Sequence, residues 1–175
     1  GRTIAAIVDA GSVLLLYFLG RRLFGRAVGL LASVLLTFTV MNIQQTHFYR
    51  PDAFIILLAL GTFWWALNVL ERGRKRDHAI LGLMVGLSFS FRASGAPLLI
   101  PVLATYAILV WRLWKSGGLP LRASMRQVLP IALMAGGIAF VTFAVLQPYA
   151  LIDYRKFFGD LGWETSVART AGSVP

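Results

Sequence analysis

A polar turn between two apolar stretches holds most of the candidate chemistry of this 175-residue chain. The segment QQTHFYRPDAF, residues 44–54, brings a histidine, a tyrosine, an arginine and an aspartate close together in sequence. Pro51 and Asp52 take the first positions of the next apolar segment, where free N–H groups and the helix dipole favour a carboxylate by about 0.3–1 kcal/mol. Asp52 could therefore act as a general base or as a ligand to a divalent metal ion, or it could simply start a helix.

Three residues shortly before Asp52 add further groups to the same turn. Arg50 could bind a phosphate through two hydrogen bonds, and it could equally neutralise Asp52. His47 could serve as a ligand or a proton carrier, although a single interfacial histidine is more often an ordinary hydrogen-bonded side chain. Tyr49 is most simply an aromatic anchor at the membrane surface.

A second basic candidate is Arg92, in the stretch SFSFRASG. An arginine at the end of an apolar helix usually faces a cavity or a partner, since burying its charge in a membrane costs about 2.5 kcal/mol or more. A phosphate group would be a suitable partner. The alternative is that Arg92 extends to the lipid headgroups.

Composition places these residues in a membrane protein. The chain is 58% hydrophobic and its mean hydropathy is +0.73, whereas soluble domains are about 45–50% apolar. The absence of cysteine excludes thiolate metal sites and cysteine nucleophiles. The net charge of +10 does not indicate nucleic-acid binding, because the basic residues fall between apolar segments rather than along one polar face.

The apolar pattern predicts an all-α fold, a polytopic transmembrane helix bundle with about six membrane helices. The predicted segments are residues 3–19, 27–42, 53–70, 79–91, 95–114 and 128–147. The second and fourth segments are short for a membrane span. We expect residues 1–147 to form the transmembrane part and residues 148–175 to form a juxtamembrane segment, much of it an amphipathic helix on the outer surface.

The distribution of charge predicts the orientation. Of the 17 Lys and Arg residues, 11 lie in or beside the first, third and fifth connections between the apolar segments. The positive-inside rule places those connections in the cytoplasm, where contact with anionic lipid accounts for them. The N-terminus, the turn at 43–52 and Arg92 are then outside, in a bacterial inner membrane. Asn68 and Glu71 lie at the inner end of the third segment and are interpreted as structural.

Four stretches resemble the membrane-embedded GT-C glycosyltransferases that use polyprenyl-phosphate carriers. These are the dolichyl-phosphate-mannose protein mannosyltransferase-like and aminoarabinose-transferase-like proteins of glycosyltransferase family 39 and its relatives. The stretches are GRTIAAIVDAGSVLLLYFLGRRLFGR at 1–26, THFYRPDAFIILLAL at 46–60, GLMVGLSFSFRASGAPLLIPVLATY at 82–106 and QPYALIDYRKFFGDL at 147–161. Each stretch is loose, but their order and spacing make the match moderately specific.

The resemblance implies an inverting transfer of a sugar from a polyprenyl-phosphate carrier to an acceptor outside the cytoplasm. It implies that Asp52 is the second outer-loop acid, near the donor phosphate or a divalent metal ion, and that Arg92 faces the lipid phosphate. Arg50 and His47 border the same place. The family's first outer-loop acid would lie upstream of Gly1, so we expect this segment alone to be inactive. The acceptor stays open among protein, lipid and polysaccharide.

Two other readings remain at this stage. In a transporter or lipid flippase subunit, Asp9, Asp52 and Arg92 would be coupling charges along a path. In a non-catalytic membrane scaffold, the same residues would be helix caps and anchors. The clustering of polar groups at one face of the membrane argues against the transporter.

Overall fold

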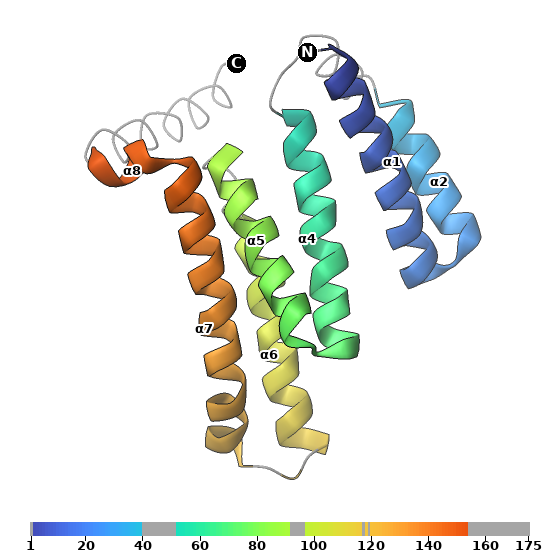
Figure 1. Ribbon diagram of the computed structural model, residues 1–175. Helices are drawn as coiled ribbons and strands as arrows, with labels where there is room; N and C mark the ends of the chain where they lie inside the picture. The colour runs from blue at the N-terminus through green and yellow to red at the C-terminus, as the bar shows by residue number, and fades with distance from the viewer. Residues whose placement is uncertain (1, 40–51, 92–96, 117, 119, 154–175) are drawn as a thin grey trace, which may run out of the picture.

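The computed structural model describes residues 2–39, 52–91, 97–116, 118 and 120–153, and Figure 1 shows their arrangement. Within these ranges the chain forms only helices and turns, which confirms the all-α prediction. The helices are α1 (Arg2–Phe24), α2 (Arg26–Thr37), α4 (Asp52–Arg72), α5 (Lys75–Phe91), α6 (Leu99–Ser116), α7 (Leu121–Leu146) and α8 (Pro148–Ile152).

Most of each predicted apolar segment lies within one of the six longer helices. Four of them, α1, α4, α6 and α7, are long and apolar enough to cross a membrane. Helix α2 has 12 residues and α5 has 17, so the two segments predicted to be short are short helices. A hydrocarbon core about 30 Å thick needs about 20 helical residues, which α4 and α7 exceed with 21 and 26.

The predicted boundaries were wrong at the inner ends of three helices. Helix α1 ends at Phe24 rather than at residue 19. Helix α7 begins at Leu121 rather than at residue 128, and α5 begins at Lys75 rather than at residue 79. Most of the extra residues are polar or charged, so hydropathy does not detect them. Most are good helix formers, and the helices continue through them beyond the apolar stretch. Helix α7 even continues through Pro130.

The three turns that carry the basic residues lie at the same end of the bundle, which we call the inner end (Figure 1). Each contains a described glycine with a positive φ, a conformation that other residues rarely adopt. The φ values are 98° at Gly25, 60° at Gly73 and 62° at Gly118. The opposite end, where α4 begins and α5 and α7 end, is called the outer end. The structure thus groups the basic turns as predicted, while their cytoplasmic location remains a prediction.

Helix α5 is held against α7 by its glycines. A Cβ atom at Gly82 would overlap the carbonyl oxygen of Ala135, and one at Gly86 would lie 2.7 Å from the Cβ atom of Thr142. The two helices therefore pack backbone to backbone, a mode common between membrane helices. On the other side of α5, the buried residues Val69 of α4 and Leu81 belong to the hydrophobic core.

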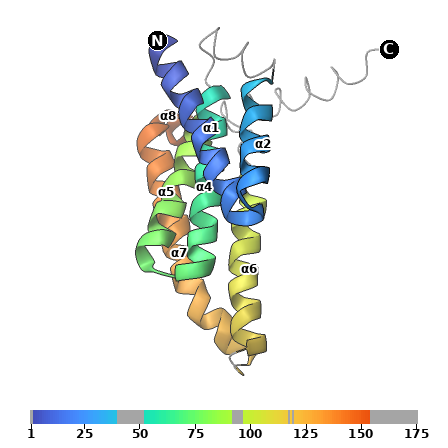
Figure 2. The same cartoon turned by 90° about the vertical axis from the view of Figure 1, so that its right-hand side faces the viewer.

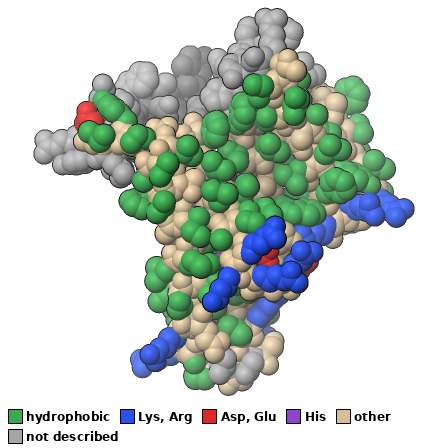
Figure 3. Space-filling model, in the orientation of Figure 1, with side chains coloured by type: hydrophobic (Ala, Val, Ile, Leu, Met, Phe, Trp, Pro, Cys, Tyr) green, Lys and Arg blue, Asp and Glu red, His purple; other side chains and the backbone are tan. Residues whose placement is uncertain are grey.

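The other helices attach around this pair. Helix α1 contacts α2 and α4, whereas α6 contacts α4 and α7 while its backbone stays apart from that of α5. Figures 1 and 2 show that the α6–α7 hairpin reaches farther toward the inner end than the other two basic turns. In Figure 3, Lys and Arg side chains gather on this face below the region where hydrophobic side chains are densest.

The proposed division at residue 147 coincides with a helix boundary. Helix α7 ends at Leu146, as the Gln-Pro pair predicts, and a short helix, α8, starts at Pro148. The amphipathic helix expected in the tail lies largely in residues 154–175, outside the described residues.

Candidate functional site

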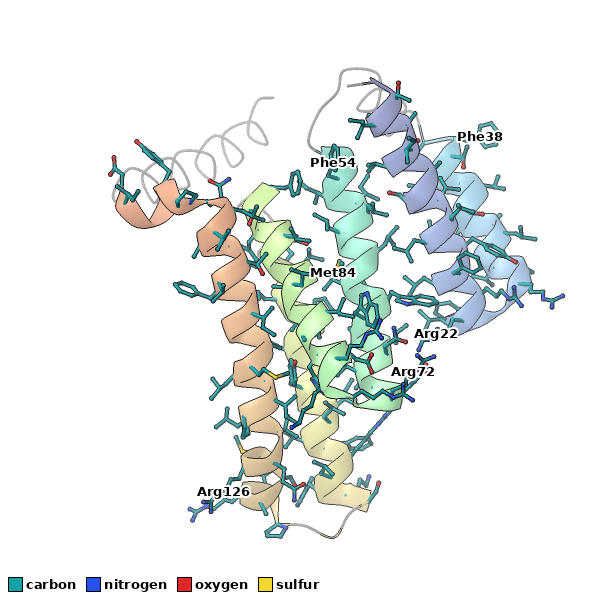
Figure 4. The ribbon with its side chains drawn as sticks, in the orientation of Figure 1. Arg22, Phe38, Phe54, Arg72, Met84 and Arg126 are labelled. Atoms are coloured by element: carbon teal, nitrogen blue, oxygen red, sulfur yellow. The ribbon has the colours of Figure 1, made fainter. Side chains whose placement is uncertain are left out.

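At the outer end of the bundle, the start of α4 and the end of α5 are in contact, and both border candidate residues in the sequence. The rings of Phe54 in α4 and Phe91 in α5 stack with their centroids 5.4 Å apart and their planes at 6°. Asp52 is the first residue of α4, two residues before Phe54, and Arg92 follows Phe91 directly in the sequence. The stack therefore brings together the start of α4, which contains Asp52, and the end of α5, which precedes Arg92 in the sequence. Figure 4 shows Phe54 at this end of α4.

A hydrogen bond ties α7 to the same place. The side-chain amide of Gln147 donates to the backbone carbonyl of Ser90, in the last turn of α5, at 2.8 Å. The last carbonyl groups of a helix have no partner within the helix, so this amide satisfies one of them and fixes the end of α5. Sequence reasoning identified Gln147 only as part of a helix stop. The signal for its role is a polar side chain directly before a proline at the end of an apolar segment.

Most of the predicted site residues lie outside the described part of the chain. His47, Tyr49 and Arg50 fall in residues 40–51, and Arg92 falls in residues 92–96. For Asp52 the structure describes the backbone at the start of α4, and this helix start is as predicted. Their proposed contacts with a phosphate or a metal ion therefore stay predictions. In the described ranges, no three His, Cys, Asp or Glu side chains lie close enough to hold a metal ion.

A separate polar cluster lies at the inner end. Arg22 of α1 donates to the carboxylate of Glu71 at 2.6 Å and 3.1 Å and to the side-chain oxygen of Asn68 at 3.0 Å. Its guanidinium also lies 4.8 Å from the ring centre of Trp64. Figure 4 shows Arg22 beside the inner end of α4. The structural interpretation of Asn68 and Glu71 is confirmed, because both join α4 to α1.

Sequence reasoning missed a second buried group near the inner end. Asp77 and His78, in the first turn of α5, are 4% and 2% exposed. Nδ1 of His78 lies 3.1 Å from the hydroxyl of Tyr106 in α6. These residues follow a run of three basic residues directly, so the sequence pattern assigns them to a solvated loop. Their burial comes from tertiary packing, with Tyr106 of α6 against His78.

An apolar groove of about 380 Å³ runs between α5, α6 and α7. It extends from Leu81 and Tyr106 to Phe89, Leu99 and Phe143, with small residues of α7 along one wall. The groove exists because α6 contacts α7 and α4 but its backbone stays away from α5. Its outer end reaches Phe89 in the last turn of α5 and Leu99 at the start of α6.

The fold is that of a polytopic membrane protein. The ends of α4 and α5 that border its candidate catalytic residues meet at the outer end. The family described as dolichyl-phosphate-mannose-protein mannosyltransferase matches residues 1–146. The chain belongs to this family, which confirms the resemblance drawn from its four stretches. It is therefore a member of a family of membrane glycosyltransferases that use polyprenyl-phosphate sugars.

Curated relatives agree with this assignment. The chain is 30% identical to undecaprenyl phosphate-alpha-4-amino-4-deoxy-L-arabinose arabinosyl transferase 1 of Pseudomonas fluorescens. It is 32% and 31% identical to the arabinosyl transferases of the same description from Pseudomonas aeruginosa and Pseudomonas paraeruginosa. Each alignment covers 98% of this chain but 30% of the relative, so the chain spans about a third of their length. No solved structure matches it.

Proposed function

We propose that the protein containing this chain transfers a sugar from a polyprenyl-phosphate carrier to an acceptor at the outer face of the membrane. Family membership supports the type of donor, and the names of the arabinosyl transferases support a lipid-linked sugar. The observation that carries the proposal is the Phe54–Phe91 stack, which joins the start of α4 to the end of α5. It favours a site that uses Asp52 and Arg92 together.

In this proposal the acceptor hydroxyl attacks the anomeric carbon of the sugar while the bond from that carbon to the carrier phosphate breaks. The configuration inverts, the acceptor loses its proton to a base, and the carrier phosphate leaves with the bonding electrons. Asp52 at the positive end of the α4 dipole stays ionised and takes the proton. Arg92 and Arg50 stabilise the negative charge that develops on the phosphate. His47 and Tyr49 border the sugar.

Asp52 has a second role open to it, as ligand to a divalent ion. Magnesium in phosphate sites is typically held by one or two protein carboxylates together with the substrate phosphate and water, so a single carboxylate fits such a site. The ion would neutralise phosphate charge when bound. A chelator separates the two roles, because EDTA lowers the transfer rate only if the ion is needed.

The decisive test is Asp52→Asn in the full-length protein. We expect transfer to fall by about 10²–10⁴-fold, the usual contribution of a general base, while membrane insertion and thermal unfolding stay unchanged. The measurement is the release of polyprenyl phosphate from a labelled polyprenyl-phosphate sugar in proteoliposomes.

Arg126→Gln is the matched control, because Arg126 is an exposed charged residue at the inner end of α7 and should leave turnover unchanged. Unchanged turnover in Asp52→Asn would remove Asp52 from the site. Movement of intact labelled lipid across the membrane without sugar transfer would contradict the enzyme and favour a transporter.

A further inference from the structure

The α6–α7 hairpin extends farther toward the inner end than the other two basic turns, as Figures 1 and 2 show. We define the hairpin tip as residues 110–116, which end α6, and residues 121–125, which begin α7. All of these residues are described by the structure. The hairpin tip is the part of the bundle with the least helix around it, so its side chains are available to a partner outside the bundle.

The register of α7 against α5 gives the size of the projection. Gly82 packs against Ala135 and Gly86 packs against Ala139, and each pair is 53 positions apart in the chain. Both helices run from the inner end to the outer end, so the same offset applies along their length. It places the start of α7 about 10 Å farther inward than Lys75, the first residue of α5.

Helix α7 is long enough to cross the hydrocarbon of a bilayer and to enter one headgroup layer. Its 26 residues extend about 39 Å, whereas the hydrocarbon core is about 30 Å thick and the whole bilayer is about 40–45 Å thick. With Leu146 at the outer edge of the hydrocarbon, the first turns of α7 lie beyond its inner edge. The hairpin tip then lies at the level of the lipid phosphates.

Aromatic and cationic side chains of the hairpin tip suit this level. Trp111 and Trp114 are each 51% exposed, and the ammonium group of Lys115 lies 5.2 Å from the ring centre of Trp111. Tryptophan is enriched at the headgroup level of membranes, because its ring contacts hydrocarbon while its N–H stays hydrated. A long basic side chain beside it carries its charge to the phosphates. The hairpin tip thus combines the two side-chain types that anchor helices at a membrane surface.

The exposed apolar side chains of the hairpin tip continue into the membrane span. Leu121, Met125, Leu129 and Leu133 recur every four residues, so they lie along one side of α7. Their exposed fractions are 49%, 53%, 56% and 65%. A soluble partner would cover only the inner part of this row. Lipid covers all of it, because the row leads from the headgroup level into the hydrocarbon.

The cations of the hairpin tip have no acidic partner in the hairpin. Lys115 and Arg122 flank the connection between α6 and α7 and are exposed, and the sequence contains no Asp or Glu from residue 78 to residue 152. The α1–α2 turn differs, because its Arg22 is paired with Glu71 at 2.6 Å. The counter-charge for the hairpin tip therefore comes from outside this stretch of chain, and lipid phosphate is the anion at that level.

We propose that the hairpin tip binds the headgroups of anionic phospholipids. Lys115 and Arg122 contact the phosphates, while Trp111, Leu121 and Met125 lie among the uppermost acyl carbons. A basic residue near an anionic membrane surface strengthens binding by about fivefold, so the two cations together distinguish an anionic lipid from a zwitterionic one. Orientation of the chain in the membrane, which any of the three basic turns could provide, would not require exposed apolar side chains beside the charges.

Photo-crosslinking in the full-length protein tests the lipid contact. A benzophenone amino acid replaces Leu121 in the hairpin tip or, as a control, Leu146 at the other end of the same helix, which is exposed to a similar extent, 51% against 49%. The probes are phosphatidylglycerol and phosphatidylethanolamine with the same acyl chains and different isotope labels, mixed equally in vesicles. We expect position 121 to capture phosphatidylglycerol at least about fivefold more than phosphatidylethanolamine, and position 146 to capture the two equally.

A double charge variant tests which residues select the lipid. Lys115→Gln with Arg122→Gln should lower the capture ratio at position 121 to below about twofold, since the two cations supply the attraction. Arg21→Gln with Arg26→Gln is the matched control, because it removes the same charge from exposed arginines of the α1–α2 turn and should leave the ratio unchanged. Salt at about 1 M should also lower the ratio, because it shortens the screening length to about 3 Å. Thermal unfolding checks that both variants keep the fold.

Three results would overturn this lipid contact. Equal capture of the two lipids at position 121 would show that the hairpin tip does not select anionic lipid. Crosslinks within the protein, or to another protein in isolated membranes, in place of lipid would show that a polypeptide covers the hairpin tip. Equal loss of the preference in both double variants would show that the total charge of the protein selects the lipid.

The lipid contact is tested without a sugar donor, so its outcome is independent of the proposed function. If the protein transfers sugar but position 121 captures both lipids equally, the lipid contact alone is wrong. If position 121 prefers phosphatidylglycerol but no sugar is transferred, the proposed function alone is wrong.

Discussion

At the inner end of the bundle, charged side chains join the helices, whereas at the outer end an aromatic stack and an amide do so. Arg22 links α1 to α4 through Glu71 and Asn68. At the outer end, Phe54 stacks on Phe91, and Gln147 bonds the end of α5. The contacts of Arg22 link α1 to α4, whereas the outer contacts link α4, α5 and α7.

From this difference we expect residues at the inner end to affect mainly the stability of the fold and residues at the outer end to affect mainly activity. The arginine at the inner end is used to hold helices together and has partners in the fold. At the outer end, the described contacts between helices come from neutral groups, and the proposed function assigns the charged residues of the adjoining turns to the substrate. Variants at the two ends should therefore differ in which property they change.

The largest effect on folding is expected where α5 and α7 meet, because this contact supports both ends. Gly82→Val places side-chain atoms against the Ala135 backbone and should lower the free energy of unfolding by about 3 kcal/mol, the upper part of the usual range for overpacking. Thermal unfolding in detergent measures it. Gly137→Val is the control, since nothing lies within 4 Å of a Cβ atom there. Equal effects of the two variants would contradict the close packing.

At the inner end, Arg22→Ala should destabilise the fold without changing turnover per folded molecule. It leaves the amide of Asn68, 4% exposed, without its partner, which costs about 2 kcal/mol. Thermal unfolding and the sugar-transfer rate are measured on the same preparation. Arg21→Ala, at the exposed neighbouring arginine, is the control. A loss of turnover larger than the loss of folded protein would break the division between the two ends.

At the outer end, Phe54→Leu should have the smallest effect on stability and a larger effect on activity. Losing the stacked pair costs about 1 kcal/mol, but the ends of α4 and α5 would no longer be fixed to each other. We expect kcat to fall about tenfold, since small displacements of catalytic groups are costly. Phe63→Leu, on the same helix, should leave kcat unchanged. If both variants keep full activity, the stack does not position the site.

Much of the fold could be predicted from the sequence, because the bilayer imposes a simple rule. Long apolar runs must become helices that satisfy their own hydrogen bonds, so hydropathy locates α1, α4, α6 and α7. The positions of Lys and Arg between the apolar runs predicted which turns share one end of the bundle. The start of α4 at Asp52 follows from its position after a proline. The extended inner ends of α5 and α7 could not be predicted, since polar residues carry no hydropathy signal.

The candidate site, too, could be predicted from the sequence only in part. The four matched stretches identified the family, and the identities of Asp52, Arg92, Arg50, His47 and Tyr49 indicated phosphate chemistry. The neighbours that join their helices, Phe91 and Gln147, act through contacts 37 and 57 residues apart in the chain. No local pattern encodes such pairs.

The glycines show most clearly what the sequence determined and what only the tertiary structure decided. The sequence determined that α5 and α7 are membrane helices containing glycines. It did not distinguish Gly82, which is required for close contact between them, from Gly136, which lines an open groove. The reason is physical, because a missing Cβ atom has meaning only once another backbone or an empty space lies opposite it. That depends on how α5, α6 and α7 dock, and docking is a property of the whole bundle.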